Sequence, residues 1–218
     1  MGVQRLPEEV RKYLETKENC MVLDVACGET EIPMEVRRMG HNYIGCDIEL
    51  KRGIDVRCDA LNLPFKESSF DCVLTFATLE HLKDPFIFFR EICRVLKNEG
   101  IVFGSSAFLE PFHENSYFHL SHKGLEMVLS KHFRNVEIRP FKGWDCFTAI
   151  YRMSYPEKLQ FLAKMLGKVN YFLIIFIREL IVSMQLNKKK RERKLKELED
   201  DRYRYSGAFF FVCSNPKK

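Results

Sequence analysis

Three aspartates stand at or near the ends of successive apolar segments in the first 60 residues. Asp24 lies in VLDVA, Asp47 in NYIGCDI and Asp59 in DVRCDA. A turn of small residues at 26–28 follows Asp24 closely. Small residues and glycine let the backbone approach a ligand closely, because no bulky side chain stands between them. Carboxylates beside such a turn can accept hydrogen bonds from amine and hydroxyl groups of a ligand.

The spacing of these acids predicts a nucleoside site. Asp47 follows Asp24 by 23 residues, a spacing typical of an acid that binds ribose hydroxyls. Asp59, followed by Ala60, can accept from the exocyclic amine of an adenine. Asp24 can accept from an amine on the ligand's tail. We therefore expect an adenosine to lie across three strand ends.

The elements that must position these acids alternate between strand and helix. Seven apolar segments predict strands, at 22–26, 42–48, 55–60, 70–77, 101–107, 135–141 and 207–214. Apolar periodicity predicts helices at 32–40, 84–100 and 120–133, the first two stopped by glycine and the third capped by Ser121. Strands that are apolar on both faces and alternate with helices indicate a doubly wound, Rossmann-like α/β fold with a mostly parallel sheet. Ligands of such sheets bind at the carboxyl ends of the strands.

The length of 218 residues suits one domain with an insertion. We expect a core at 1–141, a helical insertion at 142–206 and the last strand of the core at 207–218. The insertion holds a long apolar run at 169–186 that has two charged residues near its centre, which argues against a bilayer span. A membrane-surface helix at 165–196, a lid over the site and a homodimer contact all stay open for this segment.

Composition narrows the class of protein. The net charge of +5, from 35 basic and 30 acidic residues, is too mild to indicate a nucleic-acid partner. Eight cysteines are spread singly without a C-x-x-C pair, which argues against structural zinc and favours reduced thiols. The first residues form a charged helical pattern without the apolar region of a signal peptide. We expect a cytoplasmic protein, at most peripheral on a membrane surface.

Five segments in order carry a family resemblance: VLDVACGET, GCDIE, CDALNLPF, SSFDCVLTFATLEHLKDP and REICRVLKNEGIVF. Together they resemble the class I S-adenosylmethionine-dependent methyltransferases, in the small-molecule subgroup often called type 11. The resemblance runs from residue 20 to 140 and resumes at the last strand. It implies S-adenosylmethionine as methyl donor, with S-adenosylhomocysteine as product. The cofactor contacts it implies are Asp24, Ala26, Cys27, Gly28, Asp47, Ile48, Asp59, Ala60, Thr75 and Phe76.

The chain departs from this family in its first motif. The usual acid-x-Gly-x-Gly-x-Gly reads here Asp24-x-Ala26-x-Gly28-x-Thr30, so that only the central glycine is kept. Alanine is a mild change where φ is negative. Threonine is the larger change.

Methyl transfer from a sulfonium is an in-line displacement, in which the protein aligns the acceptor and excludes water. No universal catalytic residue is therefore expected. His81 is a candidate general base for a hydroxyl acceptor, and the alternative is that it caps the short helix after the fourth strand. His113, Tyr117 and His119 are candidate pocket residues after the fifth strand. A metal site built on His113, Glu114 and His119 is not expected, because the spacing matches no common ligand pattern.

The acceptor that we expect is a small molecule or a lipid-linked one. The sequence lacks an Asn-Pro-Pro-Tyr type motif, which argues against methylation of a planar nucleobase amine. No Pro-Cys nucleophile occurs in the loop after the fourth strand, which argues against pyrimidine C5 chemistry. Two rivals stay open. One is an NAD-dependent oxidoreductase, which shares the glycine turn and the ribose acid, and the other is a non-catalytic protein that binds the cofactor or acts as a scaffold.

Overall fold

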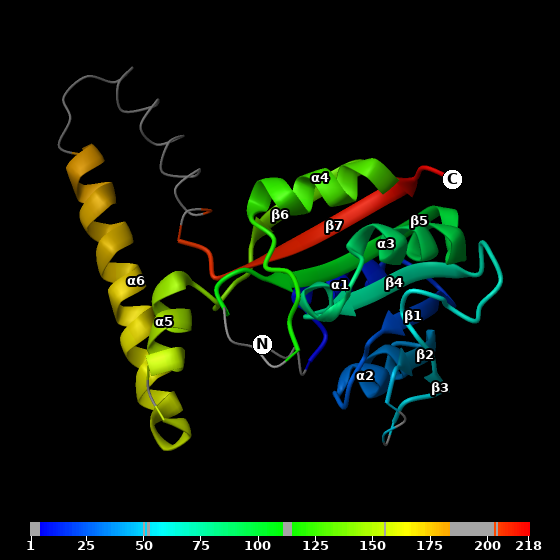
Figure 1. Cartoon of the computed structure of the whole chain (residues 1–218), viewed down its shortest axis with the longest axis horizontal. Coiled ribbons are helices and arrows are strands. Elements are labelled where there is room, and N and C mark those ends of the chain that lie inside the picture. Colours follow the sequence, from blue (N-terminus) through cyan, green and yellow to red (C-terminus); the bar gives the residue numbers. More distant parts are fainter. Residues whose placement is uncertain are drawn as a thin grey trace. The chain divides into compact units, whose positions relative to one another are not determined.

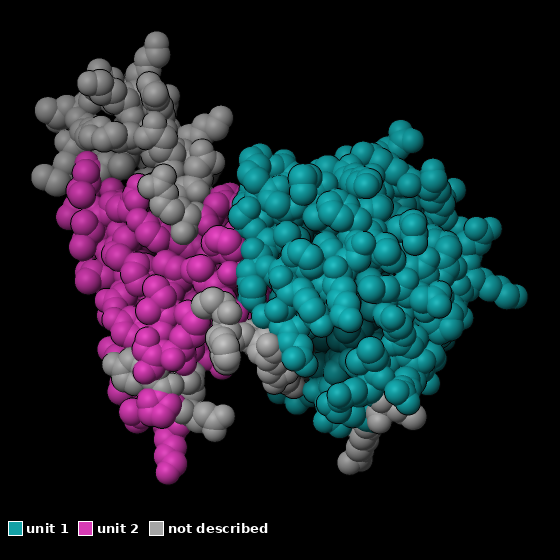
Figure 2. Space-filling view, in the orientation of Figure 1, with its two compact units in different colours: residues 1–106, 114–138, 210–218 teal, residues 107–113, 139–209 magenta. Residues whose placement is uncertain are grey.

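The computed structural model describes residues 5–49, 51, 53–110, 115–154, 156–183, 203 and 205–218. The chain divides into two compact units, coloured separately in Figure 2. Unit 1 comprises residues 1–106, 114–138 and 210–218. Unit 2 comprises residues 107–113 and 139–209, and therefore contains the predicted insertion at 142–206.

Seven strands form one sheet in the order β3-β2-β1-β4-β5-β7-β6 (Figure 1). Their bounds are β1 Met21–Val25, β2 Asn42–Asp47, β3 Val56–Arg57, β4 Phe70–Phe76, β5 Leu96–Ala107, β6 Phe133–Pro140 and β7 Ala208–Pro216. β1 pairs in parallel with both β2 and β4, and the β2–β3 and β4–β5 pairs are parallel as well. The predicted fold, a mostly parallel sheet of seven strands with helices inserted before the last one, is confirmed.

The helices around this sheet are α1 Glu8–Glu15, α2 Ile32–Arg38, α3 Pro85–Val95 and α4 His122–His132, with a 3-10 helix η1 at Leu79–His81. Two neighbouring phenylalanines of β7 show that helices cover both faces of the sheet, because consecutive strand residues point to opposite faces. Phe210 contacts Phe103 of β5, which in turn contacts Tyr13 of α1. Phe211 contacts Phe89 of α3. Helix α1 therefore covers one face and α3 the other.

Side-chain caps begin two of these helices. The carboxylate of Asp84 accepts hydrogen bonds from the N–H groups of Phe86 and Ile87, both at 2.9 Å, at the start of α3. The hydroxyl of Ser121 accepts from the N–H of Gly124 at 3.2 Å at the start of α4, as predicted.

The helix predicted at 84–100 ends earlier, and the prediction that it reaches Gly100 is wrong. Helix α3 stops at Val95 and β5 begins at Leu96. The carbonyls of Arg94 and Val95 accept from the N–H groups of Ser68 and Ser69, at 2.9 and 2.8 Å. A longer helix would need those carbonyls for its own next turn, so the turn before β4 ends it.

Unit 2 is built on two packed helices, α5 Cys146–Ser154 and α6 Gln160–Ser183, with a 3-10 helix η2 at Glu157–Leu159 between them (Figure 1). Asp145 begins α5, since its carboxylate accepts from the N–H of Thr148 at 2.9 Å and from the Thr148 hydroxyl at 2.7 Å. The amide of Asn170 donates to the hydroxyl of Tyr151 at 2.6 Å and links α6 to α5. In the part of the chain described, no helix combines the length and the apolar content that crossing a membrane requires.

Candidate functional site

A cavity of about 400 Å³ lies in unit 1 at the carboxyl ends of β1, β2 and β4. The strand order reverses between β1 and β4, and ligands of doubly wound sheets bind at such a switch point. The volume falls in the range of roughly 300–1,000 Å³ that is usual for small-molecule sites. The lining residues are Val25, Ala26, Cys46, Asp47, Ile48, Glu49, Lys51, Cys58, Asp59, Ala60, Ala77, Thr78, His81 and Leu82.

Asp47 is held rigidly at the wall of this cavity. It is the last residue of β2, and each of its two carboxylate oxygens accepts a backbone hydrogen bond. Gly28 donates to Oδ2 at 3.1 Å and Glu49 donates to Oδ1 at 3.1 Å. A carboxylate has about four lone-pair sites, so acceptor capacity is left for a ligand. The structure thus places an oriented, partly buried acceptor where the sequence predicts a ribose-binding acid.

The turn at 26–28 adopts the left-handed conformation at both ends. Ala26 has φ of +55° and Gly28 has φ of +54°. Alanine is therefore not the mild change here that it is at a negative φ: the position requires the conformation that glycine adopts without strain and that alanine adopts at a cost. Ala26 lines the cavity, whereas Cys27 is buried behind it and Gly28 contributes its N–H to Asp47.

Asp24 lies behind the cavity wall. Its side chain is 2% exposed, and its Oδ2 accepts a hydrogen bond from the Tyr43 hydroxyl at 2.9 Å. Burial raises the pKa of Asp24 to about 7; the Tyr43 hydrogen bond opposes this shift and the charge of Asp47 adds to it. The role of Asp24 toward an amine of the ligand stays a prediction.

Asp59 is oriented by its own loop. The N–H of Leu61 donates to Oδ1 of Asp59 at 2.8 Å, and the N–H of Asn62 donates to its carbonyl at 2.9 Å. These bonds form the local turn that aspartate favours. Asp59 and Ala60 both reach the cavity, on the side of β3.

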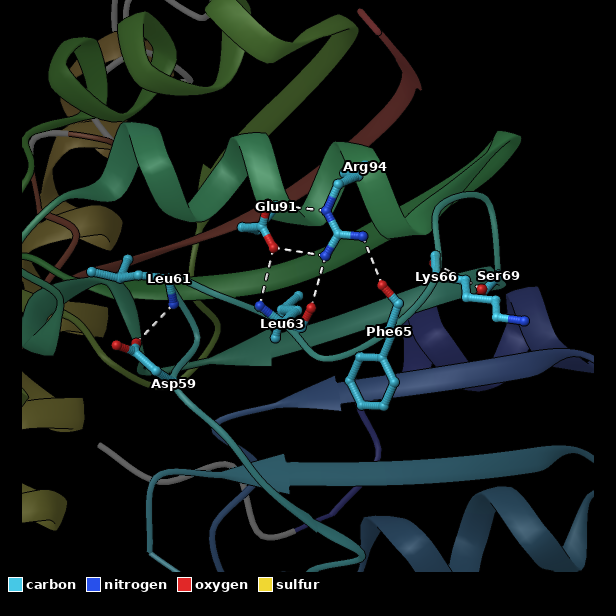
Figure 3. A network of polar contacts seen from close by, with 8 residues as sticks. All are labelled: Asp59, Leu61, Leu63, Phe65, Lys66, Ser69, Glu91 and Arg94. Atoms are coloured by element: carbon cyan, nitrogen blue, oxygen red, sulfur yellow. Dashed lines mark hydrogen bonds and ion pairs between the residues drawn. The ribbon is translucent and has the colours of Figure 1, made fainter.

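A half-buried ion pair on α3 anchors the loop that follows Asp59 (Figure 3). The guanidinium of Arg94 donates to both oxygens of Glu91 and to the carbonyls of Leu63 and Phe65, at 2.7–3.0 Å. Glu91 also accepts from the N–H of Leu63 at 3.0 Å. The Arg94 hydrogen bond holds the pKa of Glu91 below its ordinary value. Helix α3 thereby fixes the segment that carries Asp59.

Two thiols sit side by side in the cavity wall. Cys46 on β2 and Cys58 after β3 share a hydrogen bond, which raises the pKa of Cys46, with burial adding to the effect, and lowers the pKa of Cys58. Cys58 is therefore the thiol with more thiolate character. All eight cysteines of the chain are free.

The predicted catalytic residues separate in the structure. His81 lines the cavity as the last residue of η1, inside that helix and not at a capping position. The backbone of Tyr117 lies beside η1, because its N–H donates to the carbonyl of Glu80 at 2.6 Å. Its side chain is nevertheless 52% exposed and does not line the cavity. His119 is hydrogen-bonded to the hydroxyl of Ser116 at 3.1 Å and is likewise not among the lining residues. His113 lies outside the described residues.

The end of β4 contributes to the cavity one step later than predicted. Thr75 and Phe76 are buried in the core, at 1% and 9% exposed, whereas Ala77 and Thr78 line the cavity. Ala77 has φ of +52°, so the chain turns sharply as β4 ends. This turn carries no sequence signal as clear as glycine, which explains why the two residues were not predicted.

Further lining residues were missed beside the predicted acids. Glu49 and Lys51 form an exposed ion pair at 2.7 Å after β2. Their proximity to Asp47 in the sequence could have indicated them. Within the described residues, no cluster of histidine, cysteine and carboxylate side chains could hold a metal ion.

The comparisons with known proteins agree with this geometry. A family model described as a methyltransferase domain matches residues 23–104. The demethylmenaquinone methyltransferase of Corynebacterium kroppenstedtii is 34% identical over 98 residues, which cover 41% of this chain and 43% of that protein. The probable tRNA methyltransferase 9B of Mus musculus is 33% identical over 101 residues, which cover 42% of this chain and 23% of that protein. The chain thus spans less than half of the length of these curated relatives.

A solved structure extends the similarity in fold to nearly the whole chain. A SAM dependent methyltransferase from Archaeoglobus fulgidus has a TM-score of 0.58 at 17% identity, covering 96% of this chain and 91% of that one. Residues 23–104, which contain most of the motifs from VLDVACGET onward, thus match the methyltransferase-domain family, and the solved structure shares the fold of the chain.

Proposed function

We propose that the protein is an S-adenosylmethionine-dependent methyltransferase that acts on a small-molecule or lipid-linked acceptor. The observation that carries this proposal is the carboxylate of Asp47, fixed by two backbone N–H groups in the wall of a 400 Å³ cavity within the matched family segment. Bound S-adenosylmethionine would supply an activated methyl group on its sulfonium, with S-adenosylhomocysteine as the product.

The residues of the cavity fit this cofactor. Asp47 would accept from the two ribose hydroxyls, and Asp59 from the exocyclic amine of adenine. The 26–28 turn would face the amino-acid tail, in front of the buried Asp24. The chain's contribution to the reaction is then to orient the bound nucleoside, align the acceptor and exclude water.

Charge favours this cofactor over a nicotinamide dinucleotide. Three acidic residues line the cavity, Asp47, Glu49 and Asp59, against one lysine, Lys51. An acidic wall attracts the cationic sulfonium and ammonium groups and repels a pyrophosphate. The turn also lacks the full G-x-G-x-x-G pattern that cradles a pyrophosphate at a helix N-terminus.

His81 is the candidate that we propose for proton removal from a hydroxyl acceptor, because it lines the cavity and Tyr117 and His119, the other predicted catalytic residues that the structure describes, do not. One relative is named as a methyltransferase of demethylmenaquinone. The other relative is named for tRNA. The acceptor is thus best searched among hydroxylated or reduced aromatic lipids, with tRNA as the competing class.

The experiment is a turnover assay that detects S-adenosylhomocysteine, with reduced quinones, small phenols and unmodified tRNA offered in parallel. We expect product with a member of the first two classes, and its loss in Asp47→Ala. A matched control is Asp71→Ala, which removes another strand carboxylate, one that accepts from Met21 N–H and Lys97 far from the cavity lining. Turnover with tRNA alone would contradict the proposed acceptor class, and absence of turnover with every class despite cofactor binding would favour the non-catalytic rival.

A further inference from the structure

One face of α6 is apolar and exposed. Phe161, Met165, Val169, Phe172, Phe176 and Leu180, which we name the apolar stripe, are each between 46% and 82% exposed. They recur at intervals of three and four residues, so they share one face of the helix. The stripe runs from residue 161 to 180 of this 24-residue helix, which at 1.5 Å per residue is a length of about 30 Å. Contiguous patches of this size mark interaction sites.

The packing of unit 2 does not need these side chains. Helix α6 meets α5 through small residues, since Ala163 is fully buried and Gly167 lies against Thr148. A Cβ at Gly167 would come within 2.6 Å of the Thr148 backbone. The close approach of α6 to α5 therefore depends on the helix face that carries Ala163 and Gly167. The side chains of the apolar stripe lie on the opposite face of α6.

Charge indicates what covers the stripe. Residues 146–183 carry five basic and two acidic side chains. Lys164 and Lys168 are exposed on α6 beside the first half of the stripe, and one acidic residue, Glu179, is exposed near its end. The next segment of the sequence, 188–196, is also rich in lysine and arginine, although it lies outside the described residues. Basic groups beside an apolar helix face are typical of helices that lie in the surface of an anionic bilayer.

A second copy of the chain fits the same charges poorly. A two-fold contact through the stripe uses the same surface of both copies, so it would bring the net positive charge of residues 146–183 together twice. An anionic lipid surface pairs with this positive charge instead. We propose that the apolar stripe of α6 docks on the surface of an anionic lipid bilayer, parallel to the membrane plane. This docking does not depend on methyl transfer, but it would bring a lipid-linked acceptor to the enzyme.

The test is co-sedimentation of the full chain with vesicles of phosphatidylcholine, with and without anionic phosphatidylglycerol. The test variant is Phe172→Glu together with Phe176→Glu. The matched control is Met34→Glu together with Met127→Glu, which adds the same charge at exposed apolar positions of unit 1, 46% and 62% exposed. We expect the wild type and the control to bind anionic vesicles, and the test variant to bind at least about tenfold more weakly because two buried rings are lost. Binding should weaken with added salt.

Cofactor binding, measured separately by thermal shift, should be equal in all three proteins, so that failure of docking is distinguished from failure of the proposed function. Absence of binding to either vesicle, or equal binding by the wild type and the test variant, would overturn the proposal. A concentration-dependent dimer in sedimentation velocity that the test variant abolishes, without vesicle binding, would assign the stripe to a second copy instead.

Discussion

At the residue scale, the position of Asp47 is decided by the backbone around it. Its carboxylate accepts hydrogen bonds from two N–H groups, that of Gly28 in the turn after β1 and that of Glu49, two positions after Asp47. These bonds fix the orientation of the carboxylate before any ligand binds. An acceptor that is already oriented loses little entropy on binding, which makes it a strong determinant of affinity.

We predict that Asp47→Ala weakens binding of S-adenosylmethionine more than His81→Ala does. Removing the acceptor leaves two ribose hydroxyls unpaired, at a cost of about 1–3 kcal/mol, whereas His81 has no predicted bond to the cofactor. Titration calorimetry measures both variants, and circular dichroism checks that each is folded. Equal affinities for the wild type and Asp47→Ala would remove the ribose assignment.

Asp24 makes stability depend on pH. Its pKa in the folded protein is raised to about 7, above its ordinary value, mainly by burial. The folded state therefore holds this proton more tightly than the unfolded state does, so the free energy of unfolding falls as pH rises from about 4 to about 7. Asp24→Asn lacks the titrating group. We therefore predict that its free energy of unfolding falls less over this pH range than that of the wild type.

The measurement is urea unfolding of both proteins at several values between pH 5 and pH 8. All other titrating groups are shared, so the difference between the two curves isolates Asp24. The wild type should lose stability relative to the variant as pH rises toward 7 and then run parallel to it. Curves that are parallel over the whole range would contradict the raised pKa.

The sequence predicted residue types better than residue conformations. The three acids and the small turn were identified from their order and spacing. The left-handed conformation of Ala26 was not, because an alanine gives no signal that its backbone is strained. The burial of Asp24 was also not predicted, since it depends on Tyr43, 19 residues away, whose hydroxyl occupies one of its oxygens.

At the element scale, α3 supports the cavity without lining it. Arg94 and Glu91 form a half-buried ion pair, in which the Glu91 side chain is 12% exposed. The same two residues make hydrogen bonds to three backbone groups of the loop at 63–65. The loop carries Asp59 at its start. Hydrogen bonds from α3 to the backbone of this loop thus restrain the segment that carries Asp59.

We predict that Arg94→Met lowers the free energy of unfolding by about 1–3 kcal/mol, because two partly buried carbonyls and a carboxylate lose their donor. It should also weaken cofactor binding, although Arg94 does not line the cavity. Lys123→Met is the matched control: Lys123 pairs with Glu126 at the same helical spacing but on an open surface, where a pair contributes little. Urea unfolding and titration calorimetry measure both effects, and equal losses in the two variants would contradict the anchoring role of Arg94.

Element boundaries show where sequence reasoning reached its limit. The strands were found because apolar segments between turn signals define them well. The end of α3 was misplaced by several residues, because its last carbonyls bond to Ser68 and Ser69 in another part of the chain. Such a non-local competitor leaves no trace in local periodicity.

At the scale of the whole molecule, the fold was predictable and the role of the insertion was not. The alternation of strands and helices determines the sheet and places its carboxyl ends at one edge, where the acids meet. The insertion lacks an equivalent rule, since α6 buries Ala163 and exposes most of its large apolar residues. Its hydrophobicity alone could not separate a lid, a dimer contact and a membrane surface, and the exposed face with its basic neighbours now favours the last.

The central claim is that the cavity of unit 1 binds S-adenosylmethionine, and a thermal shift tests it most directly. The protein is heated with S-adenosylmethionine, S-adenosylhomocysteine and NAD in parallel. A ligand at 100 times its dissociation constant adds about 2.7 kcal/mol to the free energy of unfolding, which for a chain of this size raises Tm by roughly 5–10 °C. We predict a rise with the first two ligands and none with NAD. A rise with NAD alone, or with none of the three, would contradict the account.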